Sequence, residues 1–320
     1  GNLVKATDES GAYETCFYDA LNRVASKTDR NGAETLYEYD AVGNLTKETA
    51  PDGITEYVYD ALNRVAEVKE NSVSTQNVTY TQFGEVSSAN YGGYMVEYLY
   101  DAFGNKVKTQ FLGEQALYTY DEMNRAKTVE SNGVTTTYTY DLNGNTAKVQ
   151  TGAVSAEYEF NALNLPVRQT NKAGTATEVN TYSYDALGRV TEKNENGLVT
   201  AYAYDDLGRL SAAAEGERLT EYFYDARSNR VGKTVTEGEA VLTENYAYDQ
   251  NGRLLTLTSN GIQRAFTYDA NGNQINVVKG SETESYVYDG KNRLLESDVN
   301  GTENTYSYYP GGLRKTKDGT

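Results

Sequence analysis

The chain has 320 residues, a formal net charge of −17 and no histidine. An acidic surface of that size repels nucleic acid, and no apolar run reaches the length of a membrane span, so nucleic-acid binding and membrane insertion are disfavoured. Without histidine there is no His-based triad, His metal site or His general base, and no phosphate-binding or dinucleotide-binding loop appears. We therefore expect no enzymatic activity, no cofactor and no metal site.

One motif, Y-x-Y-D, recurs along the whole chain. We number each copy from the second aromatic residue of Y-x-Y, which is position 0, and 15 copies follow one another at spacings of 20, 21 or 24 residues. Position 0 falls at Tyr18, Tyr39, Tyr59, Tyr80, Tyr100, Tyr120, Tyr140, Phe160, Tyr184, Tyr204, Tyr224, Tyr248, Tyr268, Tyr288 and Tyr308. Because an unbroken period dictates architecture, residues 1–320 are predicted to form a single repeat array.

A turn follows position 0 in every copy. Position +1 is Asp in 12 copies, and position +4 is Gly in nine and Asn in five. Gly and Asn are the residues that most readily accept a left-handed backbone, so this column indicates a required positive φ. The predicted structural turn residues are Asp40, Gly43, Asp60, Asn63, Asp101, Gly104, Asp141, Gly144, Asp185, Gly188, Asp205, Gly208, Asp249, Gly252, Asp269 and Gly272.

The segments between turns have the pattern of β-strands. Stretches such as "VTTTYTYD" and "LVTAYAYD" are rich in Val, Thr and Tyr, and alternation places both tyrosines of a copy on one face. A second turn, often Asn-Gly or Asp-Gly, precedes them by about five residues, and such pairs are strong hairpin signals. The fold class predicted is all-β, a continuous antiparallel array of β-hairpins with about 15 repeats and roughly 30 strands.

The paired tyrosines are predicted to form a ladder along one face of this sheet. Aromatic pairs on neighbouring strands would hold the register, each contributing roughly 0.2–1 kcal/mol. The predicted ladder residues are Tyr37, Tyr39, Tyr57, Tyr59, Tyr98, Tyr100, Tyr118, Tyr120, Tyr138, Tyr140, Tyr182, Tyr184, Tyr202, Tyr204, Tyr222, Tyr224, Tyr246, Tyr248, Tyr286 and Tyr288.

Strand geometry indicates how such a ribbon is arranged. Roughly 30 strands at about 4.8 Å make a ribbon near 140 Å wide, which closed into one ring would be roughly 45 Å across. Tyrosine side chains could not meet across that space, so the ring would be hollow. The alternative is a tighter spiral in which successive turns of the ribbon meet edge to edge. We expect a hollow, spiral, barrel-like shell without a conventional core.

The polar columns have structural interpretations. The Asp at +1 can accept hydrogen bonds from the backbone of its own turn, and the frequent Arg at +5 could pair with that Asp or with a neighbouring copy. We expect both residues to shape the turn. The single cysteine, Cys16, occupies a tyrosine position and is interpreted as a small buried hydrophobic residue.

The pattern Y-x-Y-D-x-x-G-R-L at about 20-residue spacing resembles the YD repeats of the Rhs and teneurin families, over essentially the whole chain. The resemblance implies a hollow β-shell that encloses a C-terminal toxin in bacterial Rhs and insecticidal toxin-complex proteins, and an extracellular recognition scaffold in teneurins. It also implies a secreted or cell-surface location in bacteria, although no signal peptide is seen here. The implied partners are the rest of the same polypeptide, as shell caps and enclosed cargo.

One departure from the family pattern and one alternative function remain. The last copy reads "YSYYPGGLRKTKDGT", with Tyr309 and Pro310 after position 0, and resembles the final repeat before a C-terminal core that this sequence lacks. We therefore interpret the sequence as part of a larger protein. The alternative function is an extracellular adhesion or carbohydrate-binding module, in which exposed tyrosines stack on sugar rings and contact glycans or other proteins at a cell surface.

Overall fold

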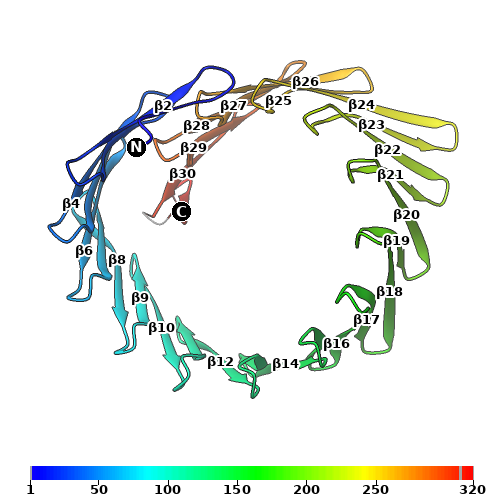
Figure 1. The fold of residues 1–320 in the computed structure, drawn as a ribbon, viewed down its shortest axis with the longest axis horizontal. Helices are drawn as coiled ribbons and strands as arrows, with labels where there is room; N and C mark the ends of the chain where they lie inside the picture. The colour runs from blue at the N-terminus through cyan, green and yellow to red at the C-terminus, as the bar shows by residue number, and fades with distance from the viewer. Residues whose placement is uncertain (1, 310–311, 320) are drawn as a thin grey trace. The chain divides into compact units, whose positions relative to one another are not determined.

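The structure, a computed structural model, describes residues 2–309 and 312–319. Over these residues it contains 31 β-strands and no helix, so no helix of the length and hydrophobicity of a membrane span is found there. Pro310, singled out by the sequence, lies outside the described residues. The hairpins follow one another in chain order (Figure 1).

The strands are, in chain order, β1 (Lys5–Thr7), β2 (Tyr13–Tyr18), β3 (Val24–Thr28), β4 (Glu34–Tyr39), β5 (Leu45–Ala50), β6 (Gly53–Tyr59), β7 (Val65–Glu70), β8 (Val73–Tyr80), β9 (Val86–Tyr91), β10 (Tyr94–Tyr100), β11 (Lys106–Phe111), β12 (Glu114–Tyr120), β13 (Ala126–Ser131), β14 (Val134–Tyr140), β15 (Thr146–Thr151) and β16 (Val154–Phe160). They continue with β17 (Pro166–Ala173), β18 (Ala176–Tyr184), β19 (Val190–Glu195), β20 (Leu198–Tyr204), β21 (Leu210–Glu215), β22 (Arg218–Tyr224), β23 (Arg230–Glu237), β24 (Ala240–Tyr248), β25 (Leu254–Ser259), β26 (Ile262–Tyr268), β27 (Gln274–Lys279), β28 (Glu282–Tyr288), β29 (Leu294–Val299), β30 (Thr302–Tyr308) and β31 (Arg314–Lys317).

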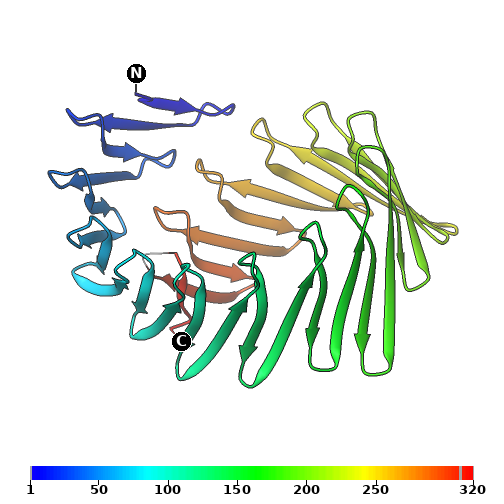
Figure 2. The ribbon, with the colours of Figure 1, turned by 60° about the horizontal axis from the view of Figure 1, so that its bottom comes forward.

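Consecutive strands pair antiparallel, which confirms the predicted hairpin array. Each copy contributes two strands: one ends at position 0, and the other begins after the turn that follows. The longer spacing between Phe160 and Tyr184 lengthens both strands of that hairpin by two residues, since β17 and β18 have 8 and 9 residues where β19 and β20 have 6 and 7. Figure 2 shows the two kinds of turn at opposite edges of the sheet.

A β-bulge lies beside position 0 and was not expected from the sequence. In β20 and β21, Ala203 pairs with Ala212 whereas Tyr204 pairs with Leu210, so Ser211 at +7 is an extra residue. The same shift recurs at Tyr59, Tyr120 and Tyr288. A bulge bends its strand and increases the local twist, so a bend recurs at this position of the repeat.

The sheet has very little buried apolar surface, as expected for a wall. The buried apolar residues among those described are Val68, Ala89, Val235 and Val277, and none of the large side chains is fully buried there. Several tyrosine strands instead alternate between half-buried and exposed positions toward their ends, as β14, β20 and β28 do. Stability must therefore come mainly from strand pairing and from the side-chain contacts of the turns.

The residues cluster into two compact units. Unit 1 comprises Gly1–Tyr80, Ala89–Tyr94 and Glu244–Thr320, and unit 2 comprises Thr81–Ser88 and Met95–Thr243. That all of residues 1–320 act as one array stays a prediction. Within unit 1, hairpins from the two ends of the sequence lie side by side, with β26 to β29 close to β2 and β4 (Figure 1).

Candidate functional site

The turn that follows position 0, here called the first turn, has one geometry throughout. The amide of the residue at +1 donates to the carbonyl at +5, as Asp205 does to Arg209 at 2.9 Å, and the +4 amide donates back to the +1 carbonyl. Position +4 has positive φ in all 15 copies, from 58° at Asn124 to 103° at Gly43, and includes Ser228 at 67°. The predicted turn residues thus occupy equivalent places in hairpin ends.

The Asp carboxylate at +1 organises this turn from inside. In Asp205, Oδ1 accepts the amides of Leu207 at 3.0 Å and Arg209 at 2.9 Å, while Oδ2 accepts Nε of Arg209 at 2.7 Å. Hydrogen bonds from the Arg64 side chain and then from its backbone amide lower the pKa of the Asp60 carboxyl below its ordinary value of 3.8. Where +5 is Arg, the charge at +1 is therefore compensated inside its own turn.

The predicted turn aspartates share most of this arrangement. All accept the amide at +5, namely Asp40, Asp60, Asp101, Asp141, Asp185, Asp205, Asp249 and Asp269. Asp269 differs because the amide of Asn271 donates to Asn31 at 3.3 Å. The partner at Oδ2 is an Arg or an Asn at +5, as the pairs Asp60–Arg64 and Asp141–Asn145 show.

The tyrosine at position 0 is bonded to the preceding copy. Its hydroxyl donates to the carbonyl of the residue that begins the strand before it, as Tyr204 does to Val190 at 2.8 Å. The same bond is made by Tyr39, Tyr59, Tyr80, Tyr100, Tyr120, Tyr140, Tyr184, Tyr224, Tyr268 and Tyr308. Tyr18 donates to Leu3, just ahead of β1. This side chain therefore ties adjacent hairpins together.

The arginine at +5 makes both of the contacts that the sequence left as alternatives. Arg189 pairs with Asp185 of its own turn at 2.7 Å, and its guanidinium lies 4.6 Å from the ring centroid of Tyr204 in the next copy. The other copies with this geometry place Arg23 over Tyr39, Arg64 over Tyr80, Arg125 over Tyr140, Arg209 over Tyr224, Arg253 over Tyr268 and Arg293 over Tyr308. These position-0 rings are covered by cations instead of lying ring on ring.

Positions +5 and +4 of successive copies vary together, a relationship that column-by-column inspection missed. In four copies an Asn at +4 accepts a hydrogen bond from an Asn at +5 of the preceding copy, and Asn22 accepts one from Asn2, ahead of the first copy. Asn229 at +5 is the exception, since Gly252 follows it. The pairs are Asn2–Asn22, Asn44–Asn63, Asn105–Asn124, Asn145–Asn164 and Asn273–Asn292, at 2.7–3.1 Å. An Arg at +5 is instead followed by Gly, or once by Ser228, which accepts from Arg209 at 3.1 Å. Reading the two columns as a pair would have found the coupling.

The tyrosine at position −2 differs from the one at position 0. Within the described residues, the hydroxyls of Tyr182 and Tyr202 make no hydrogen bond, whereas those of Tyr246 and Tyr286 donate to Glu244 and Glu284. That bond, together with burial, raises the pKa of Tyr286 to about 12. The position-0 hydroxyls thus bond the backbone, whereas the hydroxyls at −2 bond a glutamate in some copies and nothing in others.

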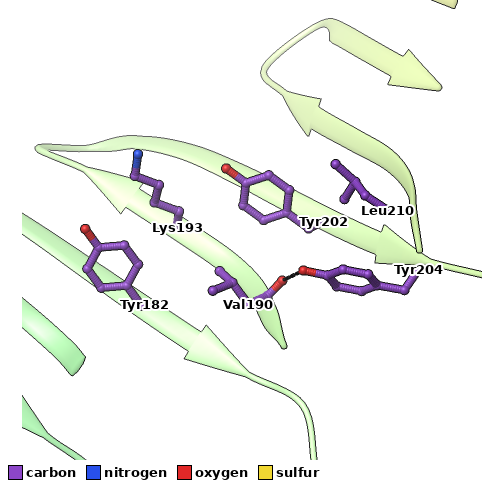
Figure 3. Close-up of a pocket in the computed structure, with 6 residues that line it drawn as sticks. All are labelled: Tyr182, Val190, Lys193, Tyr202, Tyr204 and Leu210. Atoms are coloured by element: carbon purple, nitrogen blue, oxygen red, sulfur yellow. Dashed lines mark hydrogen bonds between the residues drawn. The ribbon is translucent and has the colours of Figure 1, made fainter. Parts of the chain in front are cut away.

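An open pocket lies between such rings in unit 2. Figure 3 shows Lys193 between the rings of Tyr182 and Tyr202, with Tyr204 bonded to the carbonyl of Val190 below them. Leu210 completes the lining. Hydrogen bonding of the Lys193 ammonium to Glu195 raises the pKa of that lysine. The pocket offers aromatic faces, two hydroxyls and a cation.

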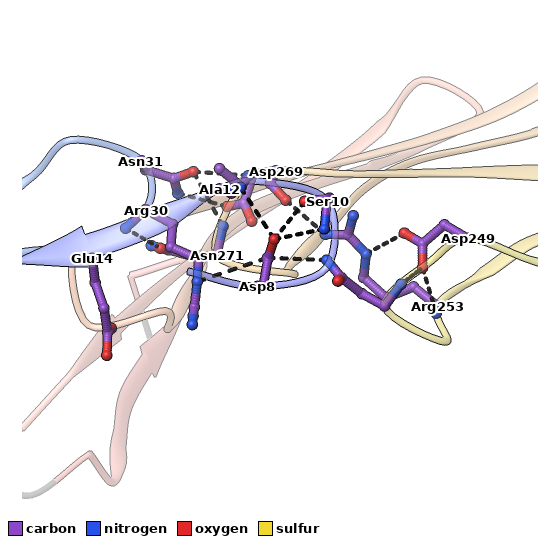
Figure 4. A network of polar contacts seen from close by, with 12 residues as sticks. Asp8, Ser10, Ala12, Glu14, Arg30, Asn31, Asp249, Arg253, Asp269 and Asn271 are labelled. Carbon is purple, nitrogen blue, oxygen red and sulfur yellow. Dashed lines mark hydrogen bonds and ion pairs between the residues drawn. The ribbon is translucent and has the colours of Figure 1, made fainter. Parts of the chain in front are cut away.

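A polar contact, which we call the seam, joins hairpin ends in unit 1. First turns of residues 249–293 meet the opposite hairpin ends, the second turns, of residues 8–55. Asn271 donates to Asp29 at 2.7 Å and accepts the Arg30 amide at 3.0 Å, while Asn31 donates to Asp269 at 2.9 Å (Figure 4). The partners Asn31 and Asp269 are 238 positions apart in the chain.

The seam extends over neighbouring turns on both sides. Asn251 donates to Asp8 at 3.0 Å, and Arg30 approaches the same carboxylate at 3.7 Å (Figure 4). Farther along, Lys291 pairs with Glu48 at 3.0 Å. A bond from Ser10 is the largest cause lowering the pKa of Asp8, and the Asn251 amide adds to it. Amide groups of each row therefore meet carboxylates of the other, and Lys291 adds a cation to these contacts.

These groups are arranged for structure more than for chemistry. No group of three or more Cys, Asp or Glu side chains that could hold a metal ion occurs in residues 2–309 and 312–319. The carboxylates of the turns are already bonded to Arg, Asn and backbone amides. The site that this fold defines is the repeated contact between turns.

The chain belongs to the family described as Teneurin YD-shell, which it matches over residues 105–241 and 233–313. It also matches the family described as RHS Repeat over residues 18–55 and 39–72. These matches confirm the resemblance on which the sequence analysis drew. No curated protein matches the chain.

Solved toxin-complex structures share the fold. The chain is 14% identical to TcdB2-TccC3-Cdc42, with a TM-score of 0.73 over 97% of this chain and 22% of that one. TcdB2-TccC3 is 14% identical to the chain, with a TM-score of 0.72 over 97% of this chain and 22% of that one. The Photorhabdus luminescens Tc holotoxin pore is also 14% identical, with a TM-score of 0.69 over 95% of this chain and 21% of that one. The chain thus spans about a fifth of the length of these relatives.

Proposed function

We propose that this chain is a non-enzymatic wall segment of a secreted or cell-surface shell that encloses a polypeptide cargo. The observation that carries the proposal is the seam, because a strip of sheet whose hairpin ends bond to others 238 positions away can surround a space. The scarcity of buried apolar residues supports it too, since such a sheet is a wall and not a packed core.

The proposed partners follow from the relatives. The solved relatives are complexes whose names join TcdB2 and TccC3, and the family is described as a shell. By likeness, the cargo would be a toxin segment, and the shell would be completed by other parts of the same polypeptide. The −17 charge would keep such a wall soluble outside a cell.

Small-angle X-ray scattering of the whole chain tests the enclosed space. A filled globular protein of this length has a radius of gyration of roughly 20 Å. A hollow wall must give a clearly larger value and a distance distribution that is shifted to long distances. A radius near the filled value would reject the shell.

Protection from protease tests the cargo. An unstructured reporter peptide fused after Thr320 should resist protease while the array is folded and become sensitive in urea. The same peptide on an unrelated folded carrier is the control. Cleavage of the fused reporter at the rate of the control would reject enclosure while leaving the scattering result intact.

A second candidate function, carbohydrate binding, is favoured by the pocket of Figure 3. The rings of Tyr182 and Tyr202 have hydroxyls without hydrogen bonds in the described part of the chain, and Lys193 lies between them. Aromatic faces with nearby polar groups suit sugar rings. Binding on a glycan array that Tyr182→Ala and Tyr202→Ala abolish would support this function, and the absence of any binding would reject it.

A further inference from the structure

The first turns of unit 2 carry a row of exposed apolar side chains along one edge of the sheet. Seven of its eight first turns have a large apolar residue at +2 or +3, the tip of the turn. Their exposure runs from 68% at Leu163 to 107% at Leu142. We call this row the apolar edge, and its residues are Phe83, Phe103, Met123, Leu142, Leu163, Leu187 and Leu207.

The same position is polar wherever a first turn meets the seam. In unit 1, the three first turns with a +3 residue in the seam have Asn251, Asn271 and Lys291 there. Exposed +3 residues of unit 1 include instead Leu21 and Leu62, each 69% exposed, and Val42, 72% exposed. The residue at the tip therefore follows the surface that the turn touches.

The edge of the sheet that carries the second turns is not suited to bind the apolar edge. In the seam, Asp8 and Asp29 of the second turns and Glu48 of β5 each pair with a hydrogen-bond donor from the opposing first turn. Leucine, phenylalanine and methionine supply no such donor. Covering those carboxylates with apolar side chains would leave charges desolvated and unpaired, which is costly.

We propose that the apolar edge of unit 2 binds the same edge of a second copy of this chain, first turn against first turn. Both edges are apolar, and both repeat every two strands, roughly 10 Å. The carboxylates at +1 are already held inside their turns, as the Asp185–Arg189 and Asp205–Arg209 pairs show, which leaves Glu122 and Asp206 at +2 as the exposed carboxylates of the edge. A contact between identical edges is isologous and closes as a dimer.

The extent of the edge is sufficient for a specific dimer. If each of the seven side chains buries on the order of 100 Å², they contribute roughly 700 Å² per copy, close to the ~800 Å² per partner of a stable interface. Exposed apolar surfaces of this extent are uncommon on monomers and mark interaction sites.

Sedimentation velocity of the full chain over a range of concentrations tests the proposal. The variant combines Leu187→Ser with Leu207→Ser on the apolar edge. The control combines Val134→Ser with Leu198→Ser, which are both 53% exposed in unit 2 but begin β14 and β20 at the opposite edge. Circular dichroism melting of all three proteins verifies folding, since every substituted side chain is exposed.

The expected result is a dimer for the natural chain and the control, with dimer dissociation at least tenfold stronger in the edge variant. A natural chain that is monomeric at every concentration overturns the proposal. So does association that the edge substitutions leave unchanged, because that would point to the outermost strands β1 and β31 as the contact.

Discussion

Arg189 extends to where a side chain on Gly208 would begin: its terminal guanidinium nitrogen lies 3.3 Å from the place of a Cβ at Gly208. Gly208 belongs to the next copy and has a φ of 79°, which Asn also tolerates. The backbone conformation alone therefore does not explain why position 208 is glycine. The length of Arg189, at +5 of the preceding copy, explains it, because this side chain occupies the space that an Asn–Asn pair would fill.

The first prediction concerns this coupling. Gly208→Asn alone should lower the free energy of unfolding by about 1 kcal/mol, because the new Cβ crowds Arg189. Adding Arg189→Asn recreates the pair found at Asn145 and Asn164, so the double variant should be more stable than the sum of the single losses by about 1 kcal/mol. Urea unfolding of the four proteins gives the coupling energy, and strictly additive losses would contradict it.

The second prediction separates the two tyrosines of a copy. Tyr204→Phe removes the 2.8 Å bond to the Val190 carbonyl and should cost about 1 kcal/mol. Tyr202→Phe removes a hydroxyl that has no hydrogen bond within the described residues, so it should cost only a few tenths of a kcal/mol. Thermal and urea unfolding compare the two. Equal losses would show that both tyrosines serve the fold alike.

Much of this fold could be predicted from the repeat, because the interactions that form each turn are short-range. Asp205 and Gly208 specify a turn by backbone chemistry that acts within five residues, so period and composition were enough to predict it. The seam could not be predicted from the sequence, because Asn251 and Asn271 resemble ordinary turn residues and their partners lie over 200 positions away in the chain. The bulge at Ser211 was missed since strand alternation alone does not reveal an extra residue.

The third prediction tests the seam with two equivalent asparagines. Asn143 and Asn271 both occupy +3 of a D-x-N-G-N turn and donate to the next copy's Asn, at 3.1 and 3.2 Å. Only Asn271 also bonds across the seam, to Asp29 and the Arg30 amide. Asn271→Ala should therefore speed hydrogen exchange at Arg30 roughly tenfold, in line with the loss of about 1–2 kcal/mol of local stability.

Asn143→Ala is the matched control and should leave exchange at residues 29–33 unchanged. Strand amides in both variants should keep their protection, because the substitution removes contacts between hairpin ends and not strand pairing. Equal exchange at Arg30 in the two variants would mean that the seam does not hold these hairpin ends together in solution.

The fourth prediction is acid sensitivity. Hydrogen bonds from Arg64 and Arg125 lower the pKa values of Asp60 and Asp121 below their ordinary value of 3.8 in the folded chain. A group whose folded-state pKa is lowered contributes stability that is complete above its unfolded value and is lost as the pH falls through the folded value. The array should therefore keep its urea midpoint from neutral pH to about pH 5 and lose stability steeply below about pH 4.

An Asp→Asn substitution at +1, which one copy of the repeat already contains, tests whether the turn aspartates cause this loss of stability at low pH. Asn161 stands at +1 in one copy and accepts the amides of Leu163 and Leu165 as an aspartate does, so Asp60→Asn and Asp121→Asn should keep the turns. Because these residues no longer titrate, the double variant should be less stable than the natural chain at neutral pH but lose less on acidification. Urea unfolding at pH 7 and pH 3 measures the free energy of unfolding under both conditions. If the double variant and the natural chain lose the same stability between the two pH values, the loss belongs to other carboxylates, such as those of the seam.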